Sequence, residues 1–390
     1  MRKSVKIFIV LGISASFLIV AIPITLILLS NQTTSNNLPR INIYVNSAIY
    51  NSISSDVQQY QQDVIAQNYS VGVISWSNTD VEVLRQHLKS AYLQGLVGAI
   101  LIGELPYKLG RFYDSDYSMD RYFPCDLYLM DFDGEWDDKD DDQILDLDPG
   151  SSFEHGNGTG DWTPEIWIAR ISPHSIIETG FNYINAYHDY FDRCFNLRHN
   201  NTYRPHKALL YIDDTWSSYK AEWESNFTAY TGANLSCYAN DPSTNSNNYM
   251  SNITNVNYEF VHLLCHSWPT YHLFGPSGSE GTITYNDIFG NVTKPLFYNL
   301  YACYACNFTQ DNNIGTHYLF SNNTITVIGS SRSGGLDLYQ PFYDALLQGK
   351  NIGESFQLWF KNPEIVKYNK EHLYYGMTIL GDPLATIHMT

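Results

Sequence analysis

Charge is scarce in this sequence, and positive charge is the scarcest. Only 16% of the 390 residues are charged, against a usual fraction of about 25%, and 22 basic residues stand against 40 acidic ones, for a net charge of −18. No basic block that could neutralise many phosphates follows the first six residues, so the sequence argues against nucleic acid as a partner. Cysteine is also sparse, because six residues at irregular spacing do not make the disulfide framework of a small secreted domain.

What the sequence does contain is apolar and aromatic surface to bury. The length corresponds to two or three domains of ordinary size, and 31 tyrosines raise the aromatic fraction to 15%. Such a chain can form one large core or two medium ones, and we do not expect disorder over most of its length.

The longest apolar run lies at the N-terminus. Residues 7–30 carry no charge and are mostly Ile, Leu, Val, Phe and Ala, which as a helix reach roughly 36 Å, enough to cross a bilayer. Arg2, Lys3 and Lys6 precede the run, so the positive-inside rule leaves residues 1–6 in the cytoplasm and exports the rest. We expect a single-pass membrane protein with an uncleaved signal-anchor; a cleaved signal peptide, which would make the protein secreted, is the alternative.

Ten Asn-x-Ser/Thr sequons agree with an exported and glycosylated surface. They include Asn31, Asn68, Asn157, Asn226, Asn252, Asn291 and Asn322. The sequence leaves the oligomeric state open.

Short β-branched runs alternate with helix-like segments behind a Ser/Thr/Asn-rich linker at 31–40. A first series of strand-like runs lies at 41–46, 71–76, 97–103, 126–131 and 165–171, and a second at 208–212, 234–239, 260–265, 296–302 and 325–330. This alternation predicts an α/β protein of two side-by-side, Rossmann-like subdomains with largely parallel sheets flanked by helices. We place the first subdomain at residues 41–200 and the second at 201–390.

An acidic loop follows the run at 126–131. It contains Asp131, Asp133 and Asp137 among seven aspartates in one turn-rich segment. Carboxylates at this spacing suit a hard cation such as calcium, which takes six to eight oxygens, whereas the position of Gly134 excludes an EF-hand. The alternative is a solvated acidic surface loop.

Two strand-like runs end in residues that can do chemistry. VHLLC runs into His266 and Ser267, and LFYNLYA runs into Cys303, so both groups reach the same edge of the second sheet. A cysteine peptidase needs a thiolate, a nearby imidazole and donors for the tetrahedral oxyanion. The order of histidine before cysteine excludes the papain arrangement and matches the caspase type.

Seven pieces of the exported region also resemble the gingipain family of caspase-like cysteine peptidases, in the order of that family. They are GAILIGELP (98–106), PCDLYLMDFDGEWD (124–137), PEIWIARI (164–171), LLCHS (263–267), YACYACNF (301–308), ITVIGSSRSGG (325–335) and ILGDPLATI (379–387). The resemblance implies two side-by-side, caspase-like α/β subdomains, of which the second carries a His/Cys dyad, often with bound calcium.

The resemblance also implies roles for individual residues. Cys303 becomes the nucleophile that forms a thioester, and His266 becomes the acid and base. The backbone N–H groups of Cys303 and Ser267 would bind the oxyanion, and Glu165 would accept a hydrogen bond from His266. We therefore expect a membrane-anchored cysteine endopeptidase that acts on protein or peptide substrates.

The chain departs from the family pattern at three places. Ser267 replaces the usual glycine and would add a side chain where substrate passes. Cys306 makes a C-x-x-C pair with Cys303, which an oxidising compartment could close into a bridge that removes the nucleophile. The segment ISPHSIIETG (171–180) has no counterpart of the specificity aspartate and the tryptophan expected after ITVIGSS is missing, so specificity for Arg or Lys is not implied.

Two other function classes stay open on the residues alone. One is a catalytically silent or redox-latent surface protein of caspase-like fold that presents its loops to a partner. The other is a calcium-dependent adhesin that uses the acidic loop.

Overall fold

The computed structural model describes residues 38–147, 163–199, 204–362 and 374–388, except positions 116, 135, 137, 139, 241 and 338. The expected membrane segment at 7–30, Asn31, Asn157 and Asp137 lie outside these residues. None of the helices in the described ranges is long and apolar enough to span a bilayer.

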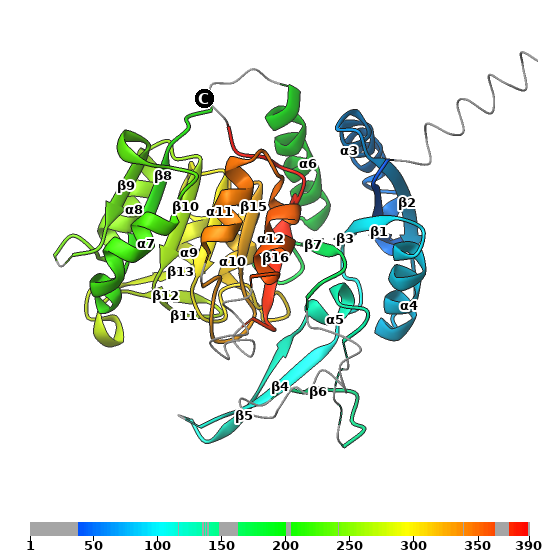
Figure 1. Cartoon of the computed structure of the whole chain (residues 1–390), viewed down its shortest axis with the longest axis horizontal. Helices are drawn as coiled ribbons and strands as arrows, with labels where there is room; N and C mark the ends of the chain where they lie inside the picture. The colour runs from blue at the N-terminus through cyan, green and yellow to red at the C-terminus, as the bar shows by residue number, and fades with distance from the viewer. Residues whose placement is uncertain are drawn as a thin grey trace, which may run out of the picture.

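A continuous ten-stranded sheet runs through the molecule with helices packed over it (Figure 1). Its strands in spatial order are β2 (Ser70–Trp76), β1 (Arg40–Asn46), β3 (Leu96–Ile102), β7 (Trp167–Ile171), β16 (Met377–Gly381), β15 (Thr326–Ser330), β14 (Phe297–Tyr301), β10 (Phe260–Leu264), β8 (Ala208–Ile212) and β9 (Leu235–Tyr238). The expected α/β class and the largely parallel sheet are therefore confirmed.

The sheet consists of two parallel blocks that run in opposite directions. Neighbouring strands are parallel throughout except for β15 and β16, which pair antiparallel. The block β2-β1-β3-β7 belongs to the first predicted subdomain, and β16 joins it to the second block. As a result the starts of β7 and β16 lie at the same edge as the ends of β15, β14 and β10.

Helices occupy the connections between strands. They are α2 (Ser47–Tyr50), α3 (Ser54–Ala66), α4 (Val81–Tyr92), α5 (Leu127–Met130), α6 (Tyr183–His199), α7 (Lys220–Asn226), α8 (Ser246–Asn255), α9 (Tyr285–Phe289), α10 (Ile314–Leu319), α11 (Gln340–Leu347) and α12 (Ile352–Phe360). Helix α4 shows how the local sequence specifies such an element. The Asp80 carboxylate accepts a hydrogen bond from the Glu82 N–H (2.8 Å) at its N-terminus, and Leu84, Leu88 and Ala91 form its buried face.

Two small sheets extend from the ends of β3 and β10. The first contains β5 (Met119–Pro124), β4 (Leu109–Asp114) and β6 (Leu145–Asp146), and the second β11 (His266–Trp268), β12 (Tyr271–Leu273) and β13 (Thr282–Thr284). Both lie on the lower side of the molecule in Figure 1. Inner strands of the large sheet such as β3, β8 and β10 are buried on both faces, which explains why they read as continuous apolar runs in the sequence.

A buried ion pair ties α5 to the join between the two blocks. Arg170 of β7 donates to both carboxylate oxygens of Asp126, at 2.7 to 3.0 Å, and Thr378 of β16 donates to the same carboxylate at 2.8 Å. Arg170 also donates to two backbone carbonyls, so the guanidinium is well satisfied in a site that excludes water.

We expect Asp126→Ala to lower the free energy of unfolding by about 3–5 kcal/mol, because it leaves the buried Arg170 charge without its partner. Denaturant unfolding of the variant measures this loss. Lys220→Ala, which removes the surface pair with Glu224, is the matched control and should cost about 0.5 kcal/mol or less. Equal losses in the two variants would contradict the prediction.

Candidate active site

The register between β10 and β14 aligns the two residues of the expected dyad. Phe260 lies opposite Phe297 and Leu264 lies opposite Tyr301, and the Cys265 N–H continues the ladder with a hydrogen bond of 3.2 Å to the Tyr301 carbonyl. The same offset sets His266 level with Cys303. Both residues therefore leave adjacent parallel strands at one edge of the sheet.

Cys303 lies in a tight turn directly after β14. The Ala305 N–H donates to the Ala302 carbonyl at 3.2 Å, and Tyr304 has a positive φ of 61°, as the third residue of a type II turn does. A tyrosine in this conformation costs roughly 1–2 kcal/mol, so other contacts must hold it. The Tyr304 N–H donates to the Arg332 carbonyl (2.8 Å), and its ring stacks on Trp268 with centroids 5.6 Å apart.

The surroundings of the Cys303 thiol shift its pKa in two opposing ways. Burial raises the pKa of the thiol, whereas the Gly334 N–H, the cysteine's own N–H and the positive charge of Arg332 lower it. Gly334 has a φ of 126°, which residues with a side chain rarely adopt, so glycine is required to aim this N–H at the sulfur. The upward shift dominates, and the thiol is protonated at neutral pH until a base removes its proton.

His266 is the first residue of β11 and is half-buried. Its ring packs against Trp216, with centroids 4.5 Å apart and planes tilted by 36°. In the part of the chain that the structure describes, the imidazole makes no hydrogen bond to Cys303. Catalytic hydrogen bonds are often long before substrate binds. The missing hydrogen bond therefore does not count against His266 as the partner of Cys303, whereas the aligned position of the two residues supports it.

The Ser267 side chain is hydrogen-bonded within the hairpin of β11 and β12. Its hydroxyl donates to the Tyr271 carbonyl (3.0 Å) and lies 3.0 Å from Nδ1 of the buried His272. The hydroxyl thus satisfies polar groups within the hairpin. The expectation that this side chain lies where substrate passes stays a prediction.

The backbone N–H of Ser267 points away from β12. On either side of β12, the Thr270 carbonyl accepts from the Tyr285 N–H and the Phe274 N–H donates to the Gly281 carbonyl, each at 3.0 Å. Since hydrogen-bonded pairs alternate along antiparallel strands, His272 bonds toward β13 and its partner Ser267 presents its N–H at the outer edge of β11. This is the direction that an oxyanion donor beside His266 requires.

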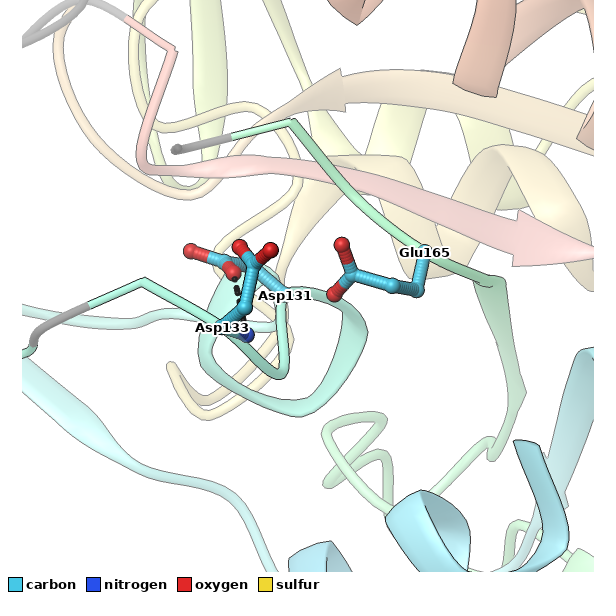
Figure 2. Close-up of side chains that lie close together, drawn as sticks. All are labelled: Asp131, Asp133 and Glu165. Atoms are coloured by element: carbon cyan, nitrogen blue, oxygen red, sulfur yellow. Dashed lines mark hydrogen bonds between the residues drawn. The ribbon is translucent and has the colours of Figure 1, made fainter. Parts of the chain in front are cut away.

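Three carboxylates meet beside the start of β7 (Figure 2). Asp131 follows α5, and Asp133 lies two residues further on. Glu165 lies two residues before the strand, with its N–H donating to the Met130 carbonyl at 3.0 Å. One oxygen of each carboxylate lies within 4.8 Å of the others. We call these three residues the acidic cluster.

Asp131 is the buried member of the acidic cluster. One of its carboxylate oxygens accepts from the N–H groups of Asp133 (3.2 Å) and Gly134 (2.8 Å), while the other has no hydrogen-bond partner within the described ranges. Burial raises the pKa of this carboxyl to about 7, and the neighbouring Glu165 charge adds to the shift. A Cβ at Gly134 would lie 2.1 Å from the unpartnered oxygen, so the chain leaves space around it.

These residues correct the role expected for Glu165. Its carboxylate accepts a hydrogen bond from the Phe132 N–H, and His266 donates no hydrogen bond to it in the described residues. Four strand steps separate β7 from β10, roughly 19 Å at the usual spacing, which explains why the two side chains do not meet. Sequence reasoning missed that Glu165 joins Asp131 and Asp133, because only the fold of α5 against β7 brings them together.

A second acidic group formed by Asp138, Asp140 and Asp142 is mostly exposed. The carboxylates of Asp138 and Asp142 accept hydrogen bonds from backbone N–H groups of the same loop, at 2.8 to 3.1 Å. Asp140, the third member, lies 3.6 Å from the Arg111 guanidinium.

Cys306, the expected redox partner of Cys303, is packed in the core. Its sulfur lies so close to Gly315 and Gly329 that a Cβ on either would approach it within 3 Å. Both cysteines are free thiols in the structure. Forming a bridge would require Cys306 to leave this position, so its packing opposes the redox hypothesis, which stays a prediction.

Comparison with known proteins identifies no family for this chain. No protein-family model matches the chain, and no curated protein matches it significantly. The resemblance to the gingipain family therefore rests on the motifs of the sequence.

We expect calcium to raise the melting temperature of the protein, because an ion would replace the repulsion within the acidic cluster by coordination. Asp131→Asn combined with Glu165→Gln should abolish the increase, whereas Asp140→Asn combined with Asp142→Asn should retain it. The measurement is thermal unfolding after chelation and after addition of calcium. An unchanged melting temperature in the wild type would leave only a solvated acidic loop.

Proposed function

We propose that the protein is a cysteine endopeptidase with Cys303 as nucleophile and His266 as acid and base. The observation that carries the proposal is the β10–β14 register, which sets these residues level at the ends of neighbouring strands. A free, half-buried thiol in a strained turn and an outward-facing backbone donor at Ser267 support the same conclusion.

The proposed reaction starts from a neutral pair. His266 takes the proton of the Cys303 thiol, and the sulfur attacks the carbonyl carbon of a peptide bond. The backbone N–H groups of Cys303 and Ser267 stabilise the oxyanion, and His266 then protonates the departing amine. Water, activated by the same imidazole, hydrolyses the thioester and restores the thiol.

General-base activation fits the electrostatics better than a permanent ion pair does. Burial holds the thiol in its protonated form, so the thiolate arises only when His266 accepts the proton during reaction. The ring must rotate from its packing on Trp216 toward Cys303 when substrate fills the site. Substrate binding thus becomes part of the activation.

The remaining elements of the proposal are an N-terminal anchor and a bound cation. The apolar run at 7–30 would hold the enzyme in a membrane with its folded part exported. Calcium in the acidic cluster would fix the loop after α5 against the start of β7, at the edge of the sheet where the dyad lies. The cation would be structural, and no step of the reaction passes through it.

We expect Cys303→Ala and His266→Ala each to reduce peptide cleavage by at least about 10²-fold, because each removes one partner of the proton transfer. Cys306→Ala should retain activity and serves as the matched control. The measurement is cleavage of a peptide library by the purified full chain, with reductant and calcium present.

Two results would contradict this assignment. An active Cys303→Ala beside an inactive Cys306→Ala would move the nucleophile to Cys306. No cleavage by a wild type whose Cys303 reacts readily with an alkylating reagent would favour the silent surface protein.

A further inference from the structure

Arg332 is a buried cation that forms no ion pair with the described residues. Its side chain is among the largest fully buried ones, at 2% exposure, and its Nε and Nη1 have no hydrogen-bond partner in the described part of the chain. The guanidinium lies over the ring of Phe112 at 3.9 Å and near that of Phe123 at 5.1 Å, both from the β4–β5 hairpin. Aromatic faces recover only part of the hydration that a buried charge loses.

Among the described residues, the titratable groups that act most strongly on the Arg332 charge include no carboxylate. These groups are Tyr304, Cys125, Tyr375 and Cys303. Burial raises the pKa values of Tyr304 and Cys125, the latter to about 12, so both stay neutral. Asp114, the carboxylate closest to Tyr304 on the hairpin, is paired with Arg121 at 3.2 Å.

The backbone of Arg332 is part of the structure that holds Cys303. Arg332 follows β15, and its carbonyl accepts the Tyr304 N–H at 2.8 Å, next to the nucleophile in the turn. Ser330, two residues earlier, accepts the Cys306 N–H at 2.9 Å, and Gly334, two residues later, directs its N–H at the Cys303 sulfur. Arg332 therefore lies between the Cys303 turn and the aromatic hairpin.

We propose that Arg332 is a positioning residue whose counter-ion is the Cys303 thiolate, formed transiently when His266 takes the thiol proton. The proposal deepens the proposed function, because it concerns the same nucleophile. No other species is consumed: the S–H proton moves to the imidazole, the electron pair stays on sulfur, and Arg332 remains protonated throughout.

The mutual charge effects agree with this assignment. Burial raises the pKa of Cys303, and the Arg332 charge lowers it. Burial lowers the pKa of Arg332 to about 10, and a Cys303 thiolate favours the charged form of Arg332. The other groups that favour the thiolate, the Gly334 and Cys303 N–H groups, are neutral dipoles. A full charge acts over a longer distance than a dipole does.

A purely structural role is the competing explanation, and it predicts different behaviour. If Arg332 only packs on Phe112 and Phe123, its loss should destabilise the fold and leave the acidity of Cys303 unchanged. If the role of Arg332 is to stabilise the thiolate, a variant with an apolar residue of similar volume at this position should be at least as stable as the wild type. In that variant the pKa of Cys303 should be higher.

The test is the pH dependence of Cys303 alkylation by iodoacetamide in the full chain, followed by mass spectrometry of the Cys303 peptide. For Arg332→Met we expect a midpoint about one pH unit higher, which corresponds to roughly tenfold slower alkylation near neutral pH, with an unchanged or higher melting temperature. Arg332→Lys should stay near the wild type, because it keeps the charge. Cys303→Ala has no thiol at this position, so it identifies which mass-spectrometric signal comes from alkylated Cys303.

An identical pH profile in wild type and Arg332→Met overturns the proposal. Should that variant fail to fold, Arg332→Gln compared with Arg332→Lys decides the question, and equal profiles again overturn it. Alkylation requires no peptidase activity, so the two proposals can fail separately. A shifted pH profile without peptide cleavage supports the role of Arg332 and counts against the proposed function. Peptide cleavage with equal pH profiles counts only against the role of Arg332.

Discussion

Main-chain pairing between β10 and β14 is the interaction on which the candidate site depends. Parallel strands alternate their side chains, so a slip of one residue would turn either His266 or Cys303 to the opposite face of the sheet. The strands are buried on both faces, and core residues such as Phe260 and Leu300 resist such a slip. The alignment of the dyad thus follows from the packing of residues that take no part in chemistry.

Two buried charges of opposite sign remain incompletely satisfied at this edge of the sheet. Within the described residues Asp131 lacks a hydrogen-bond partner for one carboxylate oxygen, and Arg332 lacks partners for two of its nitrogens. Other buried charges form ion pairs, for example Arg170 with Asp126 and Arg198 with Asp382. Incompletely satisfied buried charges often mark functional sites, and these two lie at the edge of the sheet that carries the candidate nucleophile.

Local patterns predicted the parts of the fold that depend on local chemistry. Apolar runs bounded by polar residues identified the strands of both blocks except β16 (Met377–Gly381), and their ends identified His266 and Cys303. The strand expected at 126–131 is wrong, because this run forms helix α5 (Leu127–Met130). The acidic loop identified Asp131 and Asp133 as neighbours of one another, since they lie two residues apart. These features need no knowledge of the rest of the chain.

Features that arise from contacts between distant segments could not be predicted in this way. Glu165 meets the acidic cluster because α5 folds against β7, and the Ser267 hydroxyl turns inward because β12 offers it a carbonyl and His272. The isolation of Arg332 is visible only once its surroundings are known. The reversal of direction between the blocks also depends on the pairing of two strands from different parts of the chain.

Strand β16 is synthesised after all the other strands of the large sheet. It comes from residues 377–381, yet it lies in the middle of the sheet and supplies the ladder between β7 and β15. While the chain is being made, β7 and β15 each keep an open edge until residues 377–381 have been synthesised. The candidate nucleophile therefore emerges some seventy residues before the sheet around it can close, and a chain that stops early carries Cys303 on an unfinished scaffold.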